Sequence, residues 1–204
     1  RNAGRSFTYE ILIADNGSLD QSVEIAERLG ARVVNVKERG YGAALIVGIR
    51  EAKGDCIVVG DSDSTYNFLQ SFDMIQLVLY QKYDVVMGNR FRGNIQKNAM
   101  PALHYYLGNP VLTFIGKIFF GIPINDFHCG LRAFNRKSIL NLPLNCKGME
   151  FATELIVKAS FYNYLICEVP VDLRKNPPNR KPHLRSWSDG WRHLKFMMAL
   201  SPKY

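Results

Sequence analysis

Short apolar runs alternate with amphipathic segments along the first half of the chain. Compact runs rich in Val, Ile and Leu predict strands, and longer segments with apolar residues on one side predict helices. This alternation predicts an α/β fold with a mostly parallel central sheet that helices cover on both faces. The expected strands are Tyr9–Ala14, Ala31–Val36, Asp55–Gly60 and Tyr83–Gly88, and the expected helices are 18–29, Gly42–Ala52 and Ser71–Gln81.

The first of these helices carries a recognisable start signal. Ser18 is followed three residues later by Gln21, which is the spacing of a capping box. We therefore expect Ser18 to cap the helix and Gly30 to end it.

The second half of the chain is more aromatic and more basic. Residues Met100–Phe120 are apolar and aromatic, and the Pro-rich, basic stretch Arg174–Arg185 is expected to be a loop. No linker divides the sequence, so residues 1–204 are expected to form a single domain. The further expected elements are a strand at Gly130–Phe134, a helix at Met149–Tyr162, a strand at Leu165–Val171 and an amphipathic helix at Trp187–Leu200.

The composition favours one class of binding partner but does not identify the partner. The chain has 26 Lys and Arg against 18 Asp and Glu, so its formal net charge is +8. Such a balance favours an anionic partner, whether nucleic acid, anionic lipid or a phosphorylated substrate. The four cysteines form no CxxC pair, which favours reduced, mostly buried thiols over disulfides or a zinc site. No apolar run reaches the ~18 residues of a membrane span.

Two carboxylates, Asp61 and Asp63, directly follow the strand expected at Asp55–Gly60. In parallel sheets ligands bind at the carboxyl ends of the strands, and a loop there can bring both carboxylates toward one point. Two neighbouring anions are costly without a cation between them, and a hard divalent ion such as Mg²⁺ or Mn²⁺ prefers oxygen ligands. A plain polar turn is the alternative, and the pair alone does not exclude it.

Six motifs in order give the chain a specific resemblance that covers most of its length. They are 15–20 (DNGSLD), 40–45 (GYGAAL), 61–63 (DSD), 88–91 (GNRF), 126–134 (DFHCGLRAF) and the pair 149–151 (MEF) with 168–171 (EVPV). The series resembles the family 2 glycosyltransferases with the GT-A (nucleotide-diphospho-sugar transferase) fold. Within that family it is similar to polyprenyl-phosphate glycosyltransferases of the dolichyl-phosphate mannose or glucose synthase type.

The resemblance implies a role for each motif. Asp61 and Asp63 are expected to hold Mg²⁺ or Mn²⁺, and Arg90 and Arg92 to bind the phosphate of the acceptor. Catalysis is expected to depend on Asp63, Asp126 and Arg90. The residues expected to bind the nucleotide-sugar are Asp15, Gly42, Asp61, Asp63, Arg180 and Arg185, of which the last two belong to a lid over the diphosphate.

The sequence departs from the family pattern in two places. The family opens with a βα unit whose strand reads V-x-x-P-x-x-N-E, and because this pattern does not occur in the sequence, we expect the chain to be a fragment without that unit. Thr65 stands where the dolichyl-phosphate mannose synthases often carry Gln, so no third metal ligand is assigned. Two residues within the fifth motif are interpreted structurally, Arg132 as an ion-pair partner and His128 as a packing residue.

The resemblance implies an inverting enzyme that transfers a hexose from a UDP- or GDP-linked sugar to a polyprenyl or dolichyl phosphate. Residues 1–95 are then the nucleotide-sugar-binding half and 96–204 the acceptor-binding half. Lys97–Phe120 and Trp187–Leu200 combine aromatic residues with cations, which is typical of helices in a membrane interface. The expected location is therefore the cytoplasmic face of a membrane.

Two other interpretations remain open. The same fold serves enzymes with a polysaccharide or other hydroxyl acceptor, although the lack of a QxxRW motif argues against a processive polysaccharide synthase. A basic, non-catalytic nucleic-acid-binding domain is the alternative from another class, and it would bind in a salt-sensitive way. Because the cations are spread over several loops, no nucleic-acid partner is expected.

Overall fold

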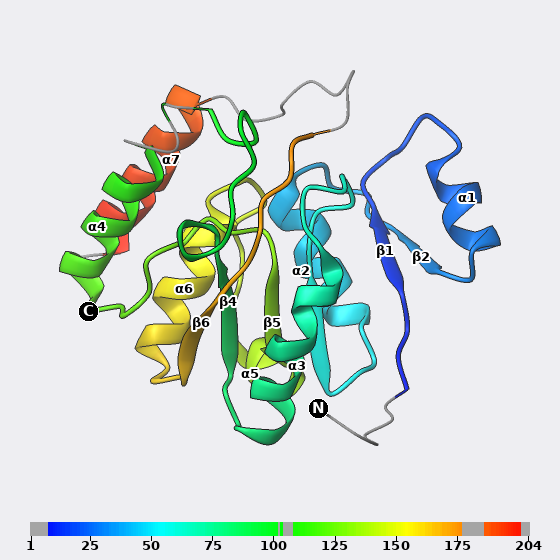
Figure 1. The fold of residues 1–204 in the computed structure, drawn as a ribbon, viewed down its shortest axis with the longest axis horizontal. Coiled ribbons are helices and arrows are strands. Elements are labelled where there is room, and N and C mark those ends of the chain that lie inside the picture. Colours follow the sequence, from blue (N-terminus) through cyan, green and yellow to red (C-terminus); the bar gives the residue numbers. More distant parts are fainter. Residues whose placement is uncertain (1–7, 102, 104–107, 177–185, 201–204) are drawn as a thin grey trace.

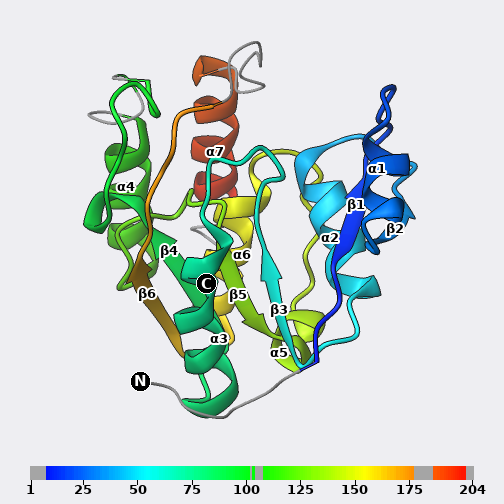
Figure 2. The same cartoon turned by 45° about the vertical axis from the view of Figure 1, so that its right-hand side comes forward.

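The computed structural model describes residues 8–101, 103, 108–176 and 186–200, and for residues 186–190 it describes the backbone alone. The α-helices and strands are numbered in chain order, and Figure 1 and Figure 2 together label them. They are β1 (Leu12–Asp15), α1 (Ser22–Arg28), β2 (Arg32–Asn35), α2 (Tyr41–Glu51), β3 (Cys56–Val59), α3 (Ser71–Tyr80), β4 (Val85–Asn89), α4 (Asn109–Phe120), β5 (Arg132–Asn135), α5 (Arg136–Asn141), α6 (Phe151–Phe161), β6 (Ile166–Pro170) and α7 (Ser186–Leu200).

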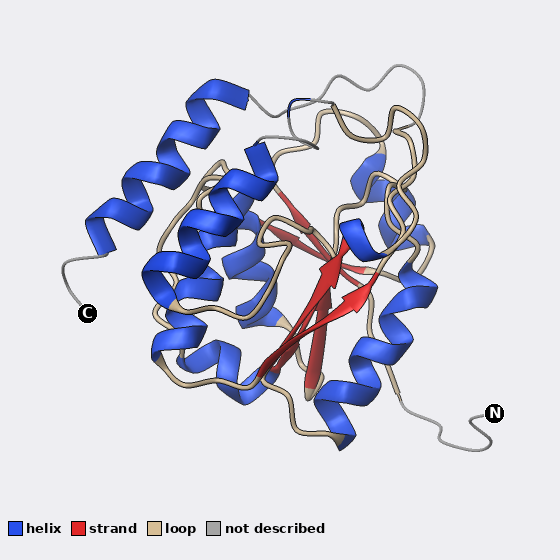
Figure 3. Ribbon diagram, turned by 60° about the vertical axis from the view of Figure 1, so that its left-hand side comes forward, coloured by secondary structure: helices blue, strands red, loops and turns tan. Residues whose placement is uncertain are grey.

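The strands form two sheets with helices on both sides (Figure 3). β1 and β2 pair in parallel, and the larger sheet has the order β3-β5-β4-β6. Within the larger sheet β4 and β6 are parallel, whereas β5 runs antiparallel to both β3 and β4. The expected α/β class is therefore confirmed, and the parallel direction holds for β3, β4 and β6 with β5 as the exception.

The reversed direction of β5 shapes one edge of the larger sheet. β3 and β4 end at this edge, while β5 begins there with Arg132, which lies opposite Val59 and Met87. The loop before β5 therefore reaches the same edge as the loops after β3 and β4. Figure 2 shows the loop after β3 rising on the side from which β5 descends.

Helix α2 joins the two sheets. It packs on β1, where Gly48 of the helix faces Ala14, and it also contacts α5 and α6. Among the described residues β1 pairs with β2 alone and β3 with β5 alone. The apolar contacts of α2, rather than strand pairing, therefore hold the smaller sheet beside the larger one.

The core lies on both faces of the larger sheet, as β4 shows most clearly. Val85 and Met87 of β4 belong to the cluster with α2, α5 and α6, whereas Val86 faces the cluster with α3. All three side chains have no exposed surface. Successive residues of a strand point to opposite faces, so an uninterrupted apolar run is what a strand covered on both sides requires.

Two local expectations are corrected by side-chain hydrogen bonds. The first helix begins at Ser22 and not after Ser18, because the Ser18 hydroxyl donates to Asp15 at 2.5 Å and the Gln21 side chain makes no cap bond. Helix α5, which the apolar pattern did not predict, begins where the Asn135 side chain accepts from the backbone N–H of Ser138. In each case a short polar side chain decides where the helix starts.

Helices α4 and α7 lie side by side on the outside of the molecule (Figure 1). Within the described part of the chain, the helices are too short or too polar to cross a membrane. The loop expected at Arg174–Arg185 lies largely outside the described residues. All four cysteines are free thiols, and the expectation that most are buried is wrong, because only Cys129 is buried and the other three are partly exposed.

Candidate functional site

A cavity of about 380 Å³ opens at the edge where β3 and β4 end and β5 begins. Both halves of the chain contribute to its wall, with Tyr41, Asp61 and Arg90 from the first half and Arg132 and His193 from the second. The other lining residues are Thr65, Tyr66, Ala99, Met100, Pro101, Gly108, Asn109, Leu112, His128, Gly130, Met149, Ala152, Leu173 and Asn176. Charged and apolar groups therefore share one cavity.

Asp61 reaches this cavity because the facing chain has no side chain. A Cβ on Gly130 would lie 2.5 Å from Oδ2 of Asp61. The Gly130 N–H donates to the hydroxyl of Tyr66 at 2.9 Å, which ties the loop before β5 to the loop after β3. Burial raises the pKa of Tyr66, so its hydroxyl stays neutral and keeps this contact.

Asp63 is held within its own loop. One of its carboxylate oxygen atoms accepts from the backbone N–H of Thr65 at 3.0 Å and from the Thr65 hydroxyl at 2.5 Å. Between them Ser64 adopts a left-handed conformation with φ of 65°. The cavity lining includes Asp61 but not Asp63. The two carboxylates supply hard oxygen atoms, which suit a divalent cation, and Thr65 acts as a support for Asp63.

Arg90 and Asp126 form a buried ion pair beside the cavity. Nε and Nη2 of Arg90 donate to the two carboxylate oxygen atoms of Asp126 at 2.8 and 2.7 Å, and the Arg90 backbone N–H adds a third bond at 3.0 Å. Burial is the largest single influence and acts to lower the pKa of Arg90, but the charge and hydrogen bond of Asp126, together with Tyr66 and Cys129, raise that pKa overall. Arg90 lines the cavity and Asp126 does not, so the geometry favours a positioning role for Asp126 over contact with the sugar.

Glu168 of β6 holds Asp126 in place. One of its oxygen atoms accepts from the backbone N–H groups of Asn125 and Asp126 at 2.6 and 2.8 Å. Its other oxygen accepts from the side chain of Asn89, the last residue of β4. β4 and β6 are thereby connected to the loop that carries Asp126.

Arg132 is the most buried cation of the cavity. Its side chain is 1% exposed, and its Nε donates to the backbone carbonyl of Cys129 at 2.7 Å. Among the described residues it has no carboxylate partner, and Nη1 is buried without any hydrogen bond. The interpretation of Arg132 as an ion-pair partner is therefore wrong.

Two histidines and a threonine connect α6 and α7 to the cavity. The Oγ1 of Thr153 lies 2.7 Å from Nδ1 of His193 and 3.5 Å from Nε2 of His128. The two imidazole rings meet edge to face with centroids 4.7 Å apart. Their sequence context gave no signal for this contact, because His193 stands in an amphipathic helix far along the chain.

The remaining expected site residues lie elsewhere. Asp15 accepts from the backbone of Gly17 and Ser18, and Gly42 is buried where α2 approaches the loop before α6. Arg92 is exposed and does not line the cavity. Arg180 and Arg185 lie outside the described residues. The motif at 40–45 instead supplies Tyr41 to the cavity wall, a contact that its glycines did not reveal.

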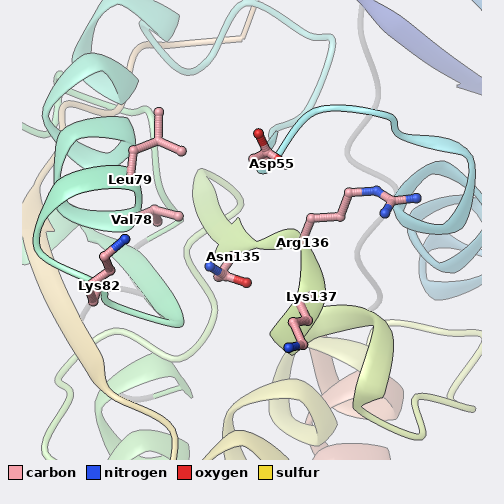
Figure 4. Close-up of a pocket in the computed structure, with 7 residues that line it drawn as sticks. All are labelled: Asp55, Val78, Leu79, Lys82, Asn135, Arg136 and Lys137. Atoms are coloured by element: carbon pink, nitrogen blue, oxygen red, sulfur yellow. The ribbon is translucent and has the colours of Figure 1, made fainter.

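A second cavity of about 430 Å³ lies where β3 begins and β5 ends. It is lined by Asp55, Val78, Leu79, Lys82, Asn135, Arg136 and Lys137. Figure 4 shows the side chains of Arg136 and Lys137 extending in different directions, and Nε of Arg136 donates to the carbonyl of Ala52. These cations do not converge on one point, so the first cavity is the better candidate.

Comparison with known proteins identifies the family of the chain. Residues 3–142 match the model of the glycosyl transferase family 2 domain. The chain is 36% identical to low-salt glycan biosynthesis hexosyltransferase Agl6 of Haloferax volcanii over 96% of its own length and 46% of that protein. It is 29% identical to a dolichyl-phosphate hexose transferase of the same organism, over 84% of the chain and 73% of the relative. The chain thus spans about half the length of Agl6.

Two further matches are a second lipid-phosphate transferase and a solved structure. An undecaprenyl-phosphate 4-deoxy-4-formamido-L-arabinose transferase of Pseudomonas paraeruginosa is 31% identical over 84% of the chain and 49% of that protein. A solved structure of glucosyl-3-phosphoglycerate synthase of Mycobacterium tuberculosis contains Mn²⁺, UDP and glucosyl-3-phosphoglycerate. It superposes with a TM-score of 0.71 at 20% identity, over 94% of this chain and 68% of that one. The chain has the GT-A fold and belongs to glycosyl transferase family 2.

Proposed function

We propose that the chain is the catalytic domain of an inverting glycosyltransferase that moves a hexose from a nucleotide-sugar to a polyprenyl phosphate. The observation that carries this proposal is the mixed lining of the cavity, where Asp61 and Arg132 share the wall with Met100, Leu112 and Leu173. An acceptor with a phosphate head and an isoprenoid chain presents both kinds of surface. The names of two relatives, which mention dolichyl phosphate and undecaprenyl phosphate, support this class.

The chemistry of a phosphate acceptor fits the residues of the cavity. A phosphate monoester with a second pKa near ~6 is largely dianionic at neutral pH, so its oxygen attacks without a general base. The oxygen forms a bond to the anomeric carbon of the sugar while the bond from that carbon to the nucleoside diphosphate breaks. A single in-line displacement inverts the anomeric configuration. The protein has to position two anions and balance their charge.

A divalent cation suits the donor side of the site. Among the described residues, no three His, Cys, Asp or Glu side chains gather to hold a metal ion. Asp61 and Asp63 would supply two oxygen ligands and leave further positions for the diphosphate, as Mg²⁺ sites commonly do. Mg²⁺ or Mn²⁺ held there would stabilise the negative charge of the leaving diphosphate.

The paired helices α4 and α7 favour a membrane surface as the working location. Val111, Phe114 and Ile118 recur along one side of α4 and are exposed, as are Trp191 and Met198 of α7. Nζ of Lys195 lies 5.7 Å from the centroid of the Trp191 ring. Exposed apolar and aromatic residues beside cations are typical of helices that lie in a lipid interface. The proposed location is the cytoplasmic face of a membrane, where a polyprenyl phosphate is available.

The test uses the full-length protein with a panel of UDP- and GDP-sugars and either Mg²⁺ or Mn²⁺. Two acceptors differ only in their head group, a polyprenyl phosphate and the corresponding polyprenol, and mass spectrometry identifies the product. We expect a glycosylated polyprenyl phosphate and no glycosylated polyprenol. Transfer to the alcohol, or to a polysaccharide alone, would favour the hydroxyl-acceptor alternative instead.

A further inference from the structure

Arg132 is a buried charge that forms no ion pair with a described carboxylate. Its side chain is 1% exposed, its Nη1 has no hydrogen bond, and no carboxylate among the described residues pairs with it. Burying a guanidinium without a partner is strongly unfavourable, so buried charges are normally paired or bind a ligand. An anion bound in the cavity would neutralise the guanidinium of Arg132 and accept a hydrogen bond from it.

The other two arginines expected near the acceptor do not offer such a charge. Arg90 is balanced by Asp126, which binds it through Nε, Nη2 and the backbone N–H. Arg92 is exposed and does not line the cavity. Arg132 is therefore the arginine of the described cavity wall whose positive charge is left for a ligand.

The fold holds Arg132 firmly at this place. It is the first residue of β5 and lies between Val59 of β3 and Met87 of β4. Its Nε bond to the Cys129 carbonyl fixes the guanidinium on the side of the loop that contacts Asp61. A side chain positioned by a central strand loses little further freedom when it binds an anion, which favours tight and specific binding.

We propose that Arg132 is the principal protein ligand of the acceptor's phosphate monoester. This inference rests on the proposed function and names the residue that recognises the head group. Asp61 lines the same cavity and repels the acceptor phosphate unless a positive charge lies between them. We therefore assign a cation held by Asp61 to the donor diphosphate and Arg132 to the acceptor phosphate. Planar guanidinium groups bind phosphate through two parallel hydrogen bonds, which a lysine cannot reproduce.

The experiment compares three variants of the full-length protein. Arg132→Met removes the charge at similar volume, and Arg132→Lys keeps the charge but loses the forked geometry. Arg136→Met is the matched control, because Arg136 stands just beyond the other end of β5 and its Nε also donates to a backbone carbonyl. Calorimetry measures binding of geranyl phosphate, inorganic phosphate and UDP or GDP with Mn²⁺, and thermal unfolding is recorded without ligand.

For Arg132→Met we expect affinity for geranyl phosphate to fall roughly 30-fold or more, with nucleotide binding nearly unchanged. Arg132→Lys should bind with intermediate affinity, and Arg136→Met should bind like the wild type. The melting temperature of Arg132→Met without ligand should stay close to that of the wild type, because the removal of an unpaired buried charge offsets the loss of the Nε bond to the Cys129 carbonyl. A purely structural arginine would instead lower the melting temperature and leave the affinity of the folded protein unchanged.

Three results would overturn the inference. In the first, Arg132→Met binds geranyl phosphate as tightly as the wild type. In the second, it loses nucleotide binding alone, so that Arg132 serves the donor. In the third, Arg136→Met loses as much affinity as Arg132→Met, so that the loss is not specific to Arg132. Failure of the proposed function differs from all of these, because the wild type itself would then bind no geranyl phosphate and transfer sugar to another acceptor.

Discussion

Arg90 and Asp126 illustrate at the scale of single residues how burial constrains the chemistry of the site. The pair has three hydrogen bonds and almost no exposed surface, and Glu168 fixes the loop that carries Asp126. A buried pair of this kind adds little net stability compared with apolar packing, but the loss of one partner leaves an uncompensated charge. The pair therefore acts chiefly as a rigid, neutral support for the cavity wall.

Replacement of Asp126 by Ala should destabilise the protein strongly. Arg90 would remain buried without its counter-ion, and we expect the free energy of unfolding to fall by about 3–5 kcal/mol. Urea denaturation followed by circular dichroism measures the change. Glu38→Ala removes one partner of the exposed pair with Lys147 and should cost less than about 1 kcal/mol. If both substitutions lowered the free energy of unfolding equally, the buried position of the Arg90–Asp126 pair would not be the cause of the loss.

Asp15 offers a pH-dependent test at the same scale. The hydrogen bond from the Ser18 hydroxyl is the main reason that the pKa of Asp15 is lowered. A carboxylate with a lowered folded-state pKa stabilises the fold above its unfolded pKa of about 3.9, and this contribution is lost as the pH falls through the folded pKa. Ser18→Ala should raise the pKa of Asp15 in a carboxyl NMR titration. Ser22→Ala, which removes the corresponding bond to Asp20, should change the Asp15 titration much less, because Asp20 acts on Asp15 only through its charge.

At the scale of elements, the beginning of α2 depends on close backbone contact. A Cβ on Gly42 would lie 2.1 Å from the carbonyl oxygen of Cys146 and 2.9 Å from that of Gly148. Tyr41, the preceding residue, lines the cavity. The glycine therefore determines how near α2 can approach the loop before α6, and with it the position of Tyr41.

Gly42→Ala should therefore destabilise the protein by about 2 kcal/mol or more, because backbone atoms cannot yield as a flexible side chain can. Gly48→Ala on the same helix is the control. Its added Cβ would meet the Ala14 side chain at 3.4 Å, and alanine is the better helix former by about 1 kcal/mol, so its effect should be small or stabilising. Chemical denaturation measures both variants, and a neutral Gly42→Ala would show that the contact is not tight.

The elements were predictable where pattern and packing agree. The apolar run Val85–Met87 predicts a buried strand because both of its faces are covered. The direction of β5 was not predictable, since a strand has the same periodicity whichever way it runs. The starts of α1 and α5 depend on single hydrogen bonds of Ser18 and Asn135, which local spacing does not determine.

At the scale of the whole molecule, the cavity arises where segments far apart in the sequence meet. Asp61 could be predicted as a site residue because it follows a strand. Tyr41 and His193 could not, because only tertiary packing brings α2 and α7 to the same wall. The same packing of α4 against α7 gathers the exposed apolar residues of both helices on one part of the surface.

This surface should matter for acceptors in a bilayer and not for soluble ones. Phe114→Glu combined with Ile118→Glu should raise KM for a long-chain polyprenyl phosphate in vesicles roughly tenfold or more, because two apolar anchors are lost. Transfer to a short, soluble isoprenyl phosphate should change little. Leu19→Glu is the control, since Leu19 is 97% exposed and lies far from α4 along the chain. Equal losses on both acceptors would indicate damage to the cavity instead of lost docking.

The central claim is that sugar transfer takes place in the cavity that contains Asp61. The most direct measurement is the rate of metal-dependent transfer to a polyprenyl phosphate by the full-length protein, compared between Asp61→Ala and Asp55→Ala, which alters the cavity at the opposite end of β3. We predict that Asp61→Ala lowers the rate at least about 100-fold, through loss of leaving-group stabilisation, and that Asp55→Ala leaves it nearly unchanged. Full activity of Asp61→Ala, or an equal loss in both variants, would contradict the claim.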